Sequence, residues 1–218
     1  MRIELAPFYA LIKDRCGLLI EGNREETLTQ ALSARIRALG VNPVLYYARV
    51  LGSAQEFQEL VNLLTINETY FFREPEQIRL VVDVLAPRFL AARAGTAPVR
   101  ILSAGCSSGE EPYSLVMALM DRYGEAVPSL FSFIAADIDS FILTKAREAC
   151  YTKFSFRNVP EALRIRYFNK VPLGYQLKEP VRKQVSFHQA NFLDSLLPPG
   201  LNGCDIIFFR NVSIYFDQ

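Results

Sequence analysis

Residues 99–114 read VRILSAGCSSGEEPYS and join a short apolar run to a glycine turn and the start of a helix. The run from Val99 to Ala104 has the length and the β-branched content of a strand. Gly105 and Gly109 carry no side chain, so the backbone between them can approach a ligand closely. Pro112 suits the first turn of a helix. We therefore predict a strand, a ligand-binding turn and a helix in this order.

The alternation of strand and helix continues along the chain. Three further apolar runs have strand length, at residues 131–136, 185–189 and 204–209. Two segments have helical spacing, at residues 112–123 and 140–149. Strands that alternate with helices predict a mostly parallel sheet covered by helices. We expect this α/β domain to occupy residues 98–218.

The residues before this domain are predicted to be helical. Leu28, Leu32, Ile36 and Leu39 recur at steps of three and four residues, which is typical of one amphipathic helix, and Gly40 then ends it. We expect residues 1–66 to form a small all-helical domain. Residues 67–97 would then form a linking segment and a helix.

Composition excludes several classes of protein. The chain has 218 residues and a formal net charge of +1, so no overall field marks it as a general nucleic-acid or membrane-surface binder. No apolar run approaches the roughly 18 residues of a membrane span, and the first ten residues lack a secretory signal. We therefore expect no membrane insertion and a cytoplasmic location. The four cysteines are widely spaced and His188 is the only histidine, so we expect no metal site and a structural role for His188.

Polar side chains follow the predicted strands, where an open α/β sheet binds its ligands. Asp137 follows the second strand and could accept both hydroxyl groups of a ribose. Alternatively, Asp137 or Asp139 only caps the next helix. Asn191 follows the third strand, and the pair Arg210–Asn211 follows the fourth. Together these positions favour a nucleoside-containing cofactor.

The glycine turn itself disfavours a pyrophosphate. Its spacing is not G-x-G-x-x-G, so the usual dinucleotide fingerprint is absent. Glu110 and Glu111 also crowd the helix start that would otherwise receive a phosphate. A cationic or neutral ligand that carries hydroxyl groups fits better.

Four motifs together resemble a known family, the chemotaxis receptor glutamate methyltransferases or CheR family. They are NETYFFRE at 67–74, SAGCSSGEEPYS at 103–114, DID at 137–139 and RNVSIYFD at 210–217. The resemblance implies a Rossmann-like sheet that binds S-adenosylmethionine, preceded by the all-helical domain and carrying a small inserted antiparallel β-subdomain at about residues 171–186. It also implies methyl transfer to glutamate side chains on the cytoplasmic helical bundle of chemoreceptors.

The resemblance assigns roles to individual residues. Arg73 and Tyr215 would lie closest to the transferred methyl group, and Asp137 would hold the ribose. Arg35 and Arg37 would face the receptor. The full set of implied cofactor contacts is Asn67, Thr69, Arg73, Glu111, Asp137, Asn191, Phe192, Arg210 and Asn211.

The basic stretch at residues 151–184 leaves the partner open. It holds eight basic and two acidic residues, a surface that would attract an acidic helical substrate or an RNA. An RNA methyltransferase and a non-catalytic fragment that binds cofactor or receptor therefore remain alternatives. The segment at 171–177 looks shorter and poorer in glycine than the version that binds a receptor's C-terminal peptide tail, so we expect independence from such a tail.

The chain stops at Gln218, whereas the family's sheet continues with further strands. An apolar strand at 206–209 would then be an uncovered edge, which proteins normally avoid. The expectation is a fragment of a longer protein whose C-terminal strands are missing.

Overall fold

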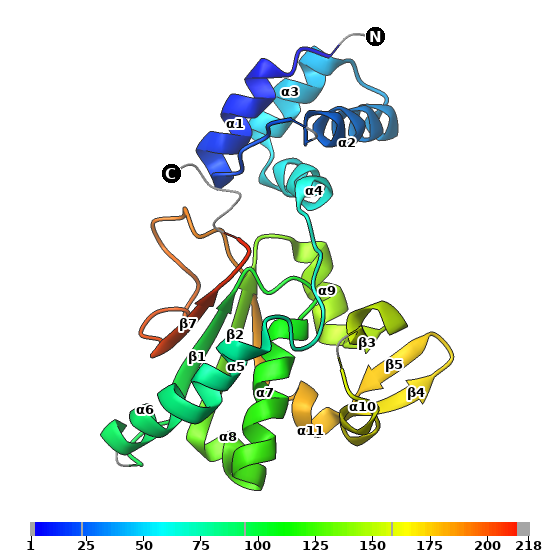
Figure 1. Cartoon of the computed structure of the whole chain (residues 1–218). Coiled ribbons are helices and arrows are strands. Elements are labelled where there is room, and N and C mark those ends of the chain that lie inside the picture. The colour runs from blue at the N-terminus through cyan, green and yellow to red at the C-terminus, as the bar shows by residue number, and fades with distance from the viewer. Residues whose placement is uncertain (1–2, 23, 94, 158, 213–218) are drawn as a thin grey trace.

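The computed structural model describes residues 3–22, 24–93, 95–157 and 159–212. The N-terminal helices lie at one end of the molecule, and an α/β sheet lies at the other end (Figure 1). The segment 65–74, which contains neither helix nor strand, joins the two parts.

The N-terminal part is a bundle of four helices around its own core. The helices are α1 (Ala6–Cys16), α2 (Arg24–Leu39), α3 (Pro43–Gly52) and α4 (Ala54–Leu64). Side-chain caps start two of them: Asn42 accepts from the Leu45 N–H at 2.9 Å, and Ser53 accepts from the Glu56 N–H at 3.1 Å. The apolar face predicted for α2 is buried against Tyr46 of α3 and residues of α4. This part is therefore all-helical, as expected.

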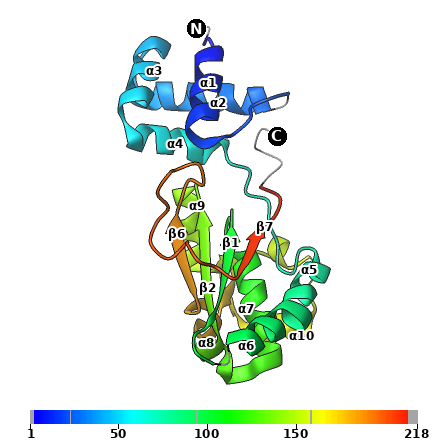
Figure 2. The ribbon, with the colours of Figure 1, turned by 90° about the vertical axis from the view of Figure 1, so that its left-hand side faces the viewer.

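The second part is built on a four-stranded parallel sheet. Its strands are β1 (Val99–Ala104), β2 (Phe131–Asp137), β6 (Val185–Gln189) and β7 (Ile206–Phe209), in the order β6-β2-β1-β7. Val99 pairs with Phe131, Ile101 with Ile206 and Asp137 with Gln189. Since all four strands run in one direction, their carboxyl ends meet at one edge, and that edge faces the helical bundle (Figure 2).

Helices cover the sheet, as the alternating pattern predicts. They are α5 (Pro75–Leu80), α6 (Ala86–Arg93), α7 (Glu110–Tyr123), α8 (Val127–Leu130) and α9 (Ser140–Glu148), with short turns η1 (Val81–Leu85) and η2 (Gly124–Ala126). Ile78 of α5 and Leu119 of α7 share one buried core with Ile101 and Phe133 of the sheet. The helix expected within residues 67–97 is interrupted by η1, a turn of π-helix.

A small antiparallel sheet flanks this domain. Its strands are β3 (Cys150–Tyr151), β4 (Phe168–Val171) and β5 (Gly174–Leu177), in the order β3-β5-β4. The short helices around it are η3 (Lys153–Phe156), α10 (Glu161–Tyr167) and α11 (Glu179–Arg182). Its strands span 150–177 and not 171–186, because the stretch at 185–189 pairs with β2 in the parallel sheet.

Phe71 attaches the linking segment to this small sheet. Its ring is fully buried and lies 4.7 Å from that of Tyr151 and 5.1 Å from that of Phe168. Aromatic contacts of this kind stabilise by about 0.5–1.5 kcal/mol each beyond the burial of apolar area. The segment 65–74 is thus held between the parallel sheet and the small sheet.

Two absences apply to the described ranges. No helix among them has the length and apolar character of a membrane span. They also hold no cluster of three or more metal-ligating side chains, and His188 lies within β6 opposite Ala136.

Candidate functional site

A cavity of about 310 Å³ lies where the strand ends meet the helical bundle. This volume is at the lower end of the range of small-molecule sites. All nine residues predicted to contact a cofactor line it: Asn67, Thr69, Arg73, Glu111, Asp137, Asn191, Phe192, Arg210 and Asn211. Tyr215, predicted to lie with Arg73 next to the transferred methyl group, lies outside the described residues. The chain therefore brings together, at one place, segments that are far apart in the sequence.

The glycine turn forms one wall of the cavity. The N–H groups of Gly105 and Cys106 both donate to the Ala136 carbonyl, at 2.8 and 3.1 Å, and this joins the end of β1 to that of β2. Gly105 has φ +72°, and a Cβ there would collide with the Val212 side chain. Only glycine accommodates both conditions.

Asp137 faces the cavity from the end of β2. Its two carboxyl oxygens accept from the backbone N–H groups of Ser107, at 2.8 Å, and Asp139, at 3.0 Å. Asp139, not Asp137, caps α9, since its Oδ1 accepts from the N–H groups of Phe141 and Ile142, both at 2.9 Å. The capping role is thus confirmed for Asp139 and wrong for Asp137. Burial raises the pKa of its carboxyl group.

The adjacent acids Glu110 and Glu111 point in different directions. Glu110 is 2% exposed and accepts from the hydroxyls of Ser108, at 2.6 Å, and Ser155, at 2.9 Å. Glu111 lines the cavity and accepts from the Ser103 hydroxyl at 2.6 Å. The expected crowding of two carboxylates is therefore avoided, and of the two only Glu111 lines the cavity. Burial raises the pKa of both.

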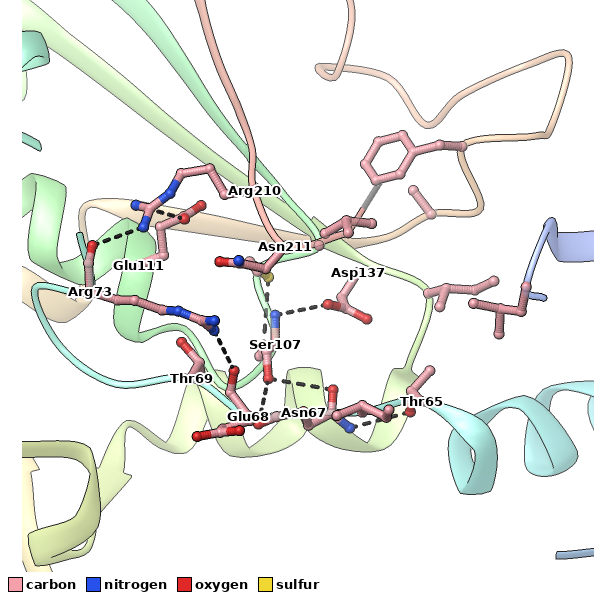
Figure 3. A pocket seen from close by; sticks show the side chains of 18 of the residues that line it. Thr65, Asn67, Glu68, Thr69, Arg73, Ser107, Glu111, Asp137, Arg210 and Asn211 are labelled. Carbon is pink, nitrogen blue, oxygen red and sulfur yellow. Dashed lines mark hydrogen bonds and ion pairs between the residues drawn. The ribbon is translucent and has the colours of Figure 1, made fainter. Parts of the chain in front are cut away.

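Two arginines gather beside Glu111 (Figure 3). Arg210 lies 3.3 Å from both Glu111 and Glu74, and it donates to the Arg73 carbonyl at 2.9 Å. The Arg73 guanidinium donates to the Glu68 carbonyl at 3.0 Å and lies 5.7 Å from the centre of the Tyr70 ring. Arg210 therefore fixes the backbone of Arg73, while the Arg73 guanidinium extends along the cavity and has further N–H groups to offer.

Two asparagines of the predicted set use their amide hydrogens inside the protein. Asn67 donates to Thr65 at 3.2 Å and to Asp139 at 2.8 Å. Asn191 donates to the Arg15 carbonyl at 2.7 Å and to Asp194 at 3.0 Å. The amide oxygens also accept inside the protein, that of Asn67 from the Ser107 hydroxyl at 3.4 Å and that of Asn191 from the Leu193 N–H at 3.2 Å, so both side chains shape the cavity wall.

The residues predicted to face a receptor differ from one another. Arg35 is not free, because its guanidinium bonds both carboxyl oxygens of Glu56, at 2.9 and 2.8 Å, and lies 3.7 Å from Glu59. Arg37 is exposed and donates to the Ser33 carbonyl at 3.2 Å. Of the two, only Arg37 presents its charge at the surface.

Sequence reasoning missed several lining residues. Cys16, Leu18 and Arg24 reach the cavity from the helical bundle, and no motif or spacing marks them. Ser107 lies within the glycine turn, so its position in that motif could have identified it. A bundle expected to meet a receptor thus also contributes to the walls of the cavity.

The charges around the cavity are mixed. Glu68, Glu111 and Asp137 carry acid groups, and Arg24, Arg73 and Arg210 carry basic groups. A polyphosphate would meet repulsion from the acids, whereas a zwitterionic amino-acid group and ribose hydroxyls would find both donors and acceptors. In Figure 3 the paired charges of Arg210 and Glu111 lie at one end of the cavity, the Arg73 side chain extends from there, and Asp137 with Ser107 lies toward the other end. The donor set therefore fits a nucleoside that carries an amino acid.

Two family models match the chain. The CheR methyltransferase SAM-binding domain matches residues 67–218, and the CheR methyltransferase all-alpha domain matches residues 3–65. These matches cover the two parts seen in the structure.

Individual relatives show how much of a protein the chain represents. It is 39% identical to a "Probable biofilm formation methyltransferase WspC" of Pseudomonas putida, over 96% of this chain and 49% of that protein. It is 34% identical to a "Chemotaxis protein methyltransferase 2" of Vibrio cholerae, over 94% of this chain and 72% of that protein. A "Chemotaxis protein methyltransferase" of Escherichia coli is also 34% identical, over 95% and 72%. The chain spans about half the length of the WspC relatives.

Proposed function

Because the chain belongs to the CheR methyltransferase family, we propose that it binds S-adenosylmethionine in the cavity and methylates glutamate side chains on the cytoplasmic helical bundle of chemoreceptors. The observation that carries the proposal is the convergence of all nine predicted contacts on one cavity at the strand ends. The names of the relatives, which are methyltransferases of chemotaxis and of biofilm formation, support a role in receptor-type signalling.

The cavity residues divide the cofactor between them in this proposal. Asp137 would accept the ribose hydroxyls, which suits a carboxylate already fixed by two backbone N–H groups. Glu111 and Arg73 would take the ammonium and carboxylate groups of the amino-acid end. When bound, S-adenosylmethionine supplies an electrophilic methyl carbon on a positively charged sulfur.

For this methyl transfer the chain has mainly to align the glutamate carboxylate with the methyl group. A glutamate carboxylate has a pKa near 4.3 and is ionised at neutral pH, so no general base has to remove a proton. The Arg73 guanidinium can orient one carboxylate oxygen through its remaining N–H groups and leave the other to attack. Holding two reacting groups in line can supply roughly 7–11 kcal/mol in well-oriented systems. This accounts for a site that contains no histidine among its described lining residues.

The basic stretch around the small sheet indicates what kind of partner the chain would bind. Arg157 pairs with Glu68 of the cavity rim at 3.1 Å, so the basic stretch begins beside the entrance. An acidic helical substrate would be attracted to the basic stretch and to Arg37. Because the proposed substrate is the cytoplasmic bundle of a receptor, we propose that the reaction takes place in the cytoplasm. The β4–β5 hairpin has only Pro172 and Leu173 between its strands. This short connection supports independence from a receptor peptide tail.

Methyl incorporation tests the proposal. The purified chain is incubated with methyl-labelled S-adenosylmethionine and, in parallel, with receptor cytoplasmic fragments or RNA. Label on the receptor that is released as methanol by mild alkali is expected, since it reports a glutamate ester. Alkali-stable label on RNA would identify an RNA methyltransferase, and binding of S-adenosylhomocysteine without incorporation would identify a non-catalytic module. Either result would refute the proposal.

A further inference from the structure

A buried carboxylate joins the linking segment to the sheet. Asp139 is 1% exposed, and its Oδ2 accepts from the Thr65 hydroxyl at 2.6 Å and from the Asn67 amide at 2.8 Å. Its Oδ1 caps α9. Every part of this carboxylate is therefore engaged, and half of its bonds go to the segment that follows the helical bundle.

The same residue supports the cavity acid directly. The Asp139 N–H donates to Asp137 Oδ1 at 3.0 Å. A displacement of Asp139 would thus disturb one of the two N–H groups that fix the Asp137 carboxylate. The linking segment and the proposed ribose contact are coupled through two consecutive hydrogen bonds.

A second attachment lies outside the cavity lining. Gln58 of α4 donates to the Ile138 carbonyl at 2.8 Å and accepts from the Gln189 amide at 2.6 Å. Asn62, one turn later, donates to the Ser140 hydroxyl at 3.0 Å. Helix α4 is therefore seated on the ends of β2 and β6 by polar contacts, which are geometrically specific and cannot slide as an apolar surface can.

The position of the bundle decides the shape of the cavity. Cys16, the last residue of α1, and Leu18, just after that helix, form part of its wall. They reach it only while α4 and the linking segment keep the bundle above the strand ends. Asn191 adds a third tie through the Arg15 carbonyl.

We infer that this joint, made by Thr65, Asn67 and Asp139 with Gln58 on α4, is a positioning device for cofactor affinity. It holds the helical bundle against the sheet so that the bundle completes the cofactor cavity. The identity of the ligand rests on the proposed function. The joint acts through the Asp137 carboxylate and the bundle wall, so weakening it lowers the fraction of molecules competent to bind, and the apparent Kd rises in inverse proportion to that fraction.

The decisive variant is Gln58→Met, because Gln58 does not line the cavity. Calorimetry is expected to show a Kd for S-adenosylhomocysteine that is about fivefold or more above that of the unmodified chain. In the methylation assay KM for the cofactor should rise while kcat at saturation stays the same. Thr65→Val should act in the same direction, and Thr65→Ser, which keeps the hydroxyl, should restore the affinity.

Gln30→Met is the matched control. Gln30 is an exposed glutamine of the same bundle, and its side chain donates to Glu26 within its own helix. This variant should leave the Kd unchanged. Equal Kd values for Gln58→Met, Thr65→Val and the control would overturn the inference, as would a fall in kcat with no change in KM.

Amide hydrogen exchange across residues 65–73 separates this inference from the proposed function. Faster exchange in Gln58→Met than in Gln30→Met is expected even without cofactor, since the joint restrains this segment. If the unmodified chain failed to bind S-adenosylhomocysteine, the proposed function would be refuted. The exchange experiment would still test whether the joint restrains residues 65–73. Identical exchange in both variants would refute it.

Discussion

Replacing Asp137 by asparagine tests the chemistry of the cavity at one atom. The carboxylate presents two oxygens, and each already accepts one backbone N–H, from Ser107 and from Asp139. An asparagine has one oxygen, so its amide nitrogen must face one of these donors. The variant therefore loses the charge and part of the fixed orientation that ribose hydroxyls would use.

The magnitude follows from the number of bonds involved. A hydrogen bond to a charged group contributes about 1.5–3 kcal/mol, which corresponds to an increase of about 10- to 150-fold in Kd. The free energy of unfolding should change less than the free energy of binding. Burial raises the pKa of Asp137, so its ionised form disfavours the folded state at neutral pH, and a neutral amide removes this penalty while it loses one N–H bond.

Calorimetric titration with S-adenosylhomocysteine measures the effect, and thermal unfolding checks the fold. Asp121→Asn is the control: that aspartate bonds the Tyr167 hydroxyl at 2.5 Å and Arg166 at 2.7 Å, away from the cavity lining. A Kd for Asp137→Asn within threefold of the control, with both variants folded, would refute the assignment.

Four further outcomes are expected. Arg73→Ala should lower kcat by roughly 100-fold, as loss of a group that orients the reacting carboxylate does, and an unchanged kcat would remove Arg73 from the reaction. Affinity for S-adenosylhomocysteine should weaken as the pH falls toward the raised pKa of Asp137, above the ordinary 3.8, because the protonated acid loses acceptor capacity; titrations between about pH 5 and 8 check this, and stronger binding in acid would contradict it. Burial raises the pKa of Glu110 above 4.5 in the folded chain, so its contribution to stability is lost as the pH rises from 4.5 through this raised pKa. The unfolding free energy of Glu110→Gln, relative to that of the unmodified chain, should therefore increase with pH, and parallel pH profiles of the two proteins would exclude the effect. Gly105→Ala should reduce the free energy of unfolding by about 1–3 kcal/mol, measured by denaturant titration, because of its φ of +72° and the contact with Val212.

Local patterns predicted the strands closely, and the exceptions have visible causes. The apolar run at 204–209 becomes a strand only from Ile206, because Asp205 accepts from the Arg100 N–H at 2.8 Å and from Arg93. The Arg100 N–H of β1 therefore donates to the Asp205 side chain, whereas in a regular sheet it would donate to a backbone carbonyl of the neighbouring strand. The π-helical turn at 81–85 has no counterpart in the spacing of the apolar residues.

Long-range pairing was harder to predict than local structure. The run at 185–189 was correctly assigned to the parallel sheet, but the small antiparallel sheet was placed too late in the chain, because its first strand is the two-residue β3. That strand is defined by the pairing of Cys150 with Gln176 and of Tyr151 with Tyr175, which lie too far along the chain for a local window to contain both partners.

In the site, too, features set by local sequence could be predicted and features set by distant segments could not. Residues at strand ends could be predicted because a parallel sheet brings those ends together whatever the details of packing. The opposite directions of Glu110 and Glu111 depend on Ser155 and Arg210, which come from distant segments. The wall supplied by Cys16 and Leu18 depends on how two domains meet, and the sequence contains no local sign of that contact.

A crystal structure of the chain with S-adenosylhomocysteine, at a concentration that saturates binding in solution, tests the central claim most directly. The ligand is predicted to fill the cavity between the glycine turn and the linking segment, with its ribose at Asp137 and its amino-acid group beside Arg73 and Glu111. Density for the ligand at another place, or with the ribose away from Asp137, would contradict the account.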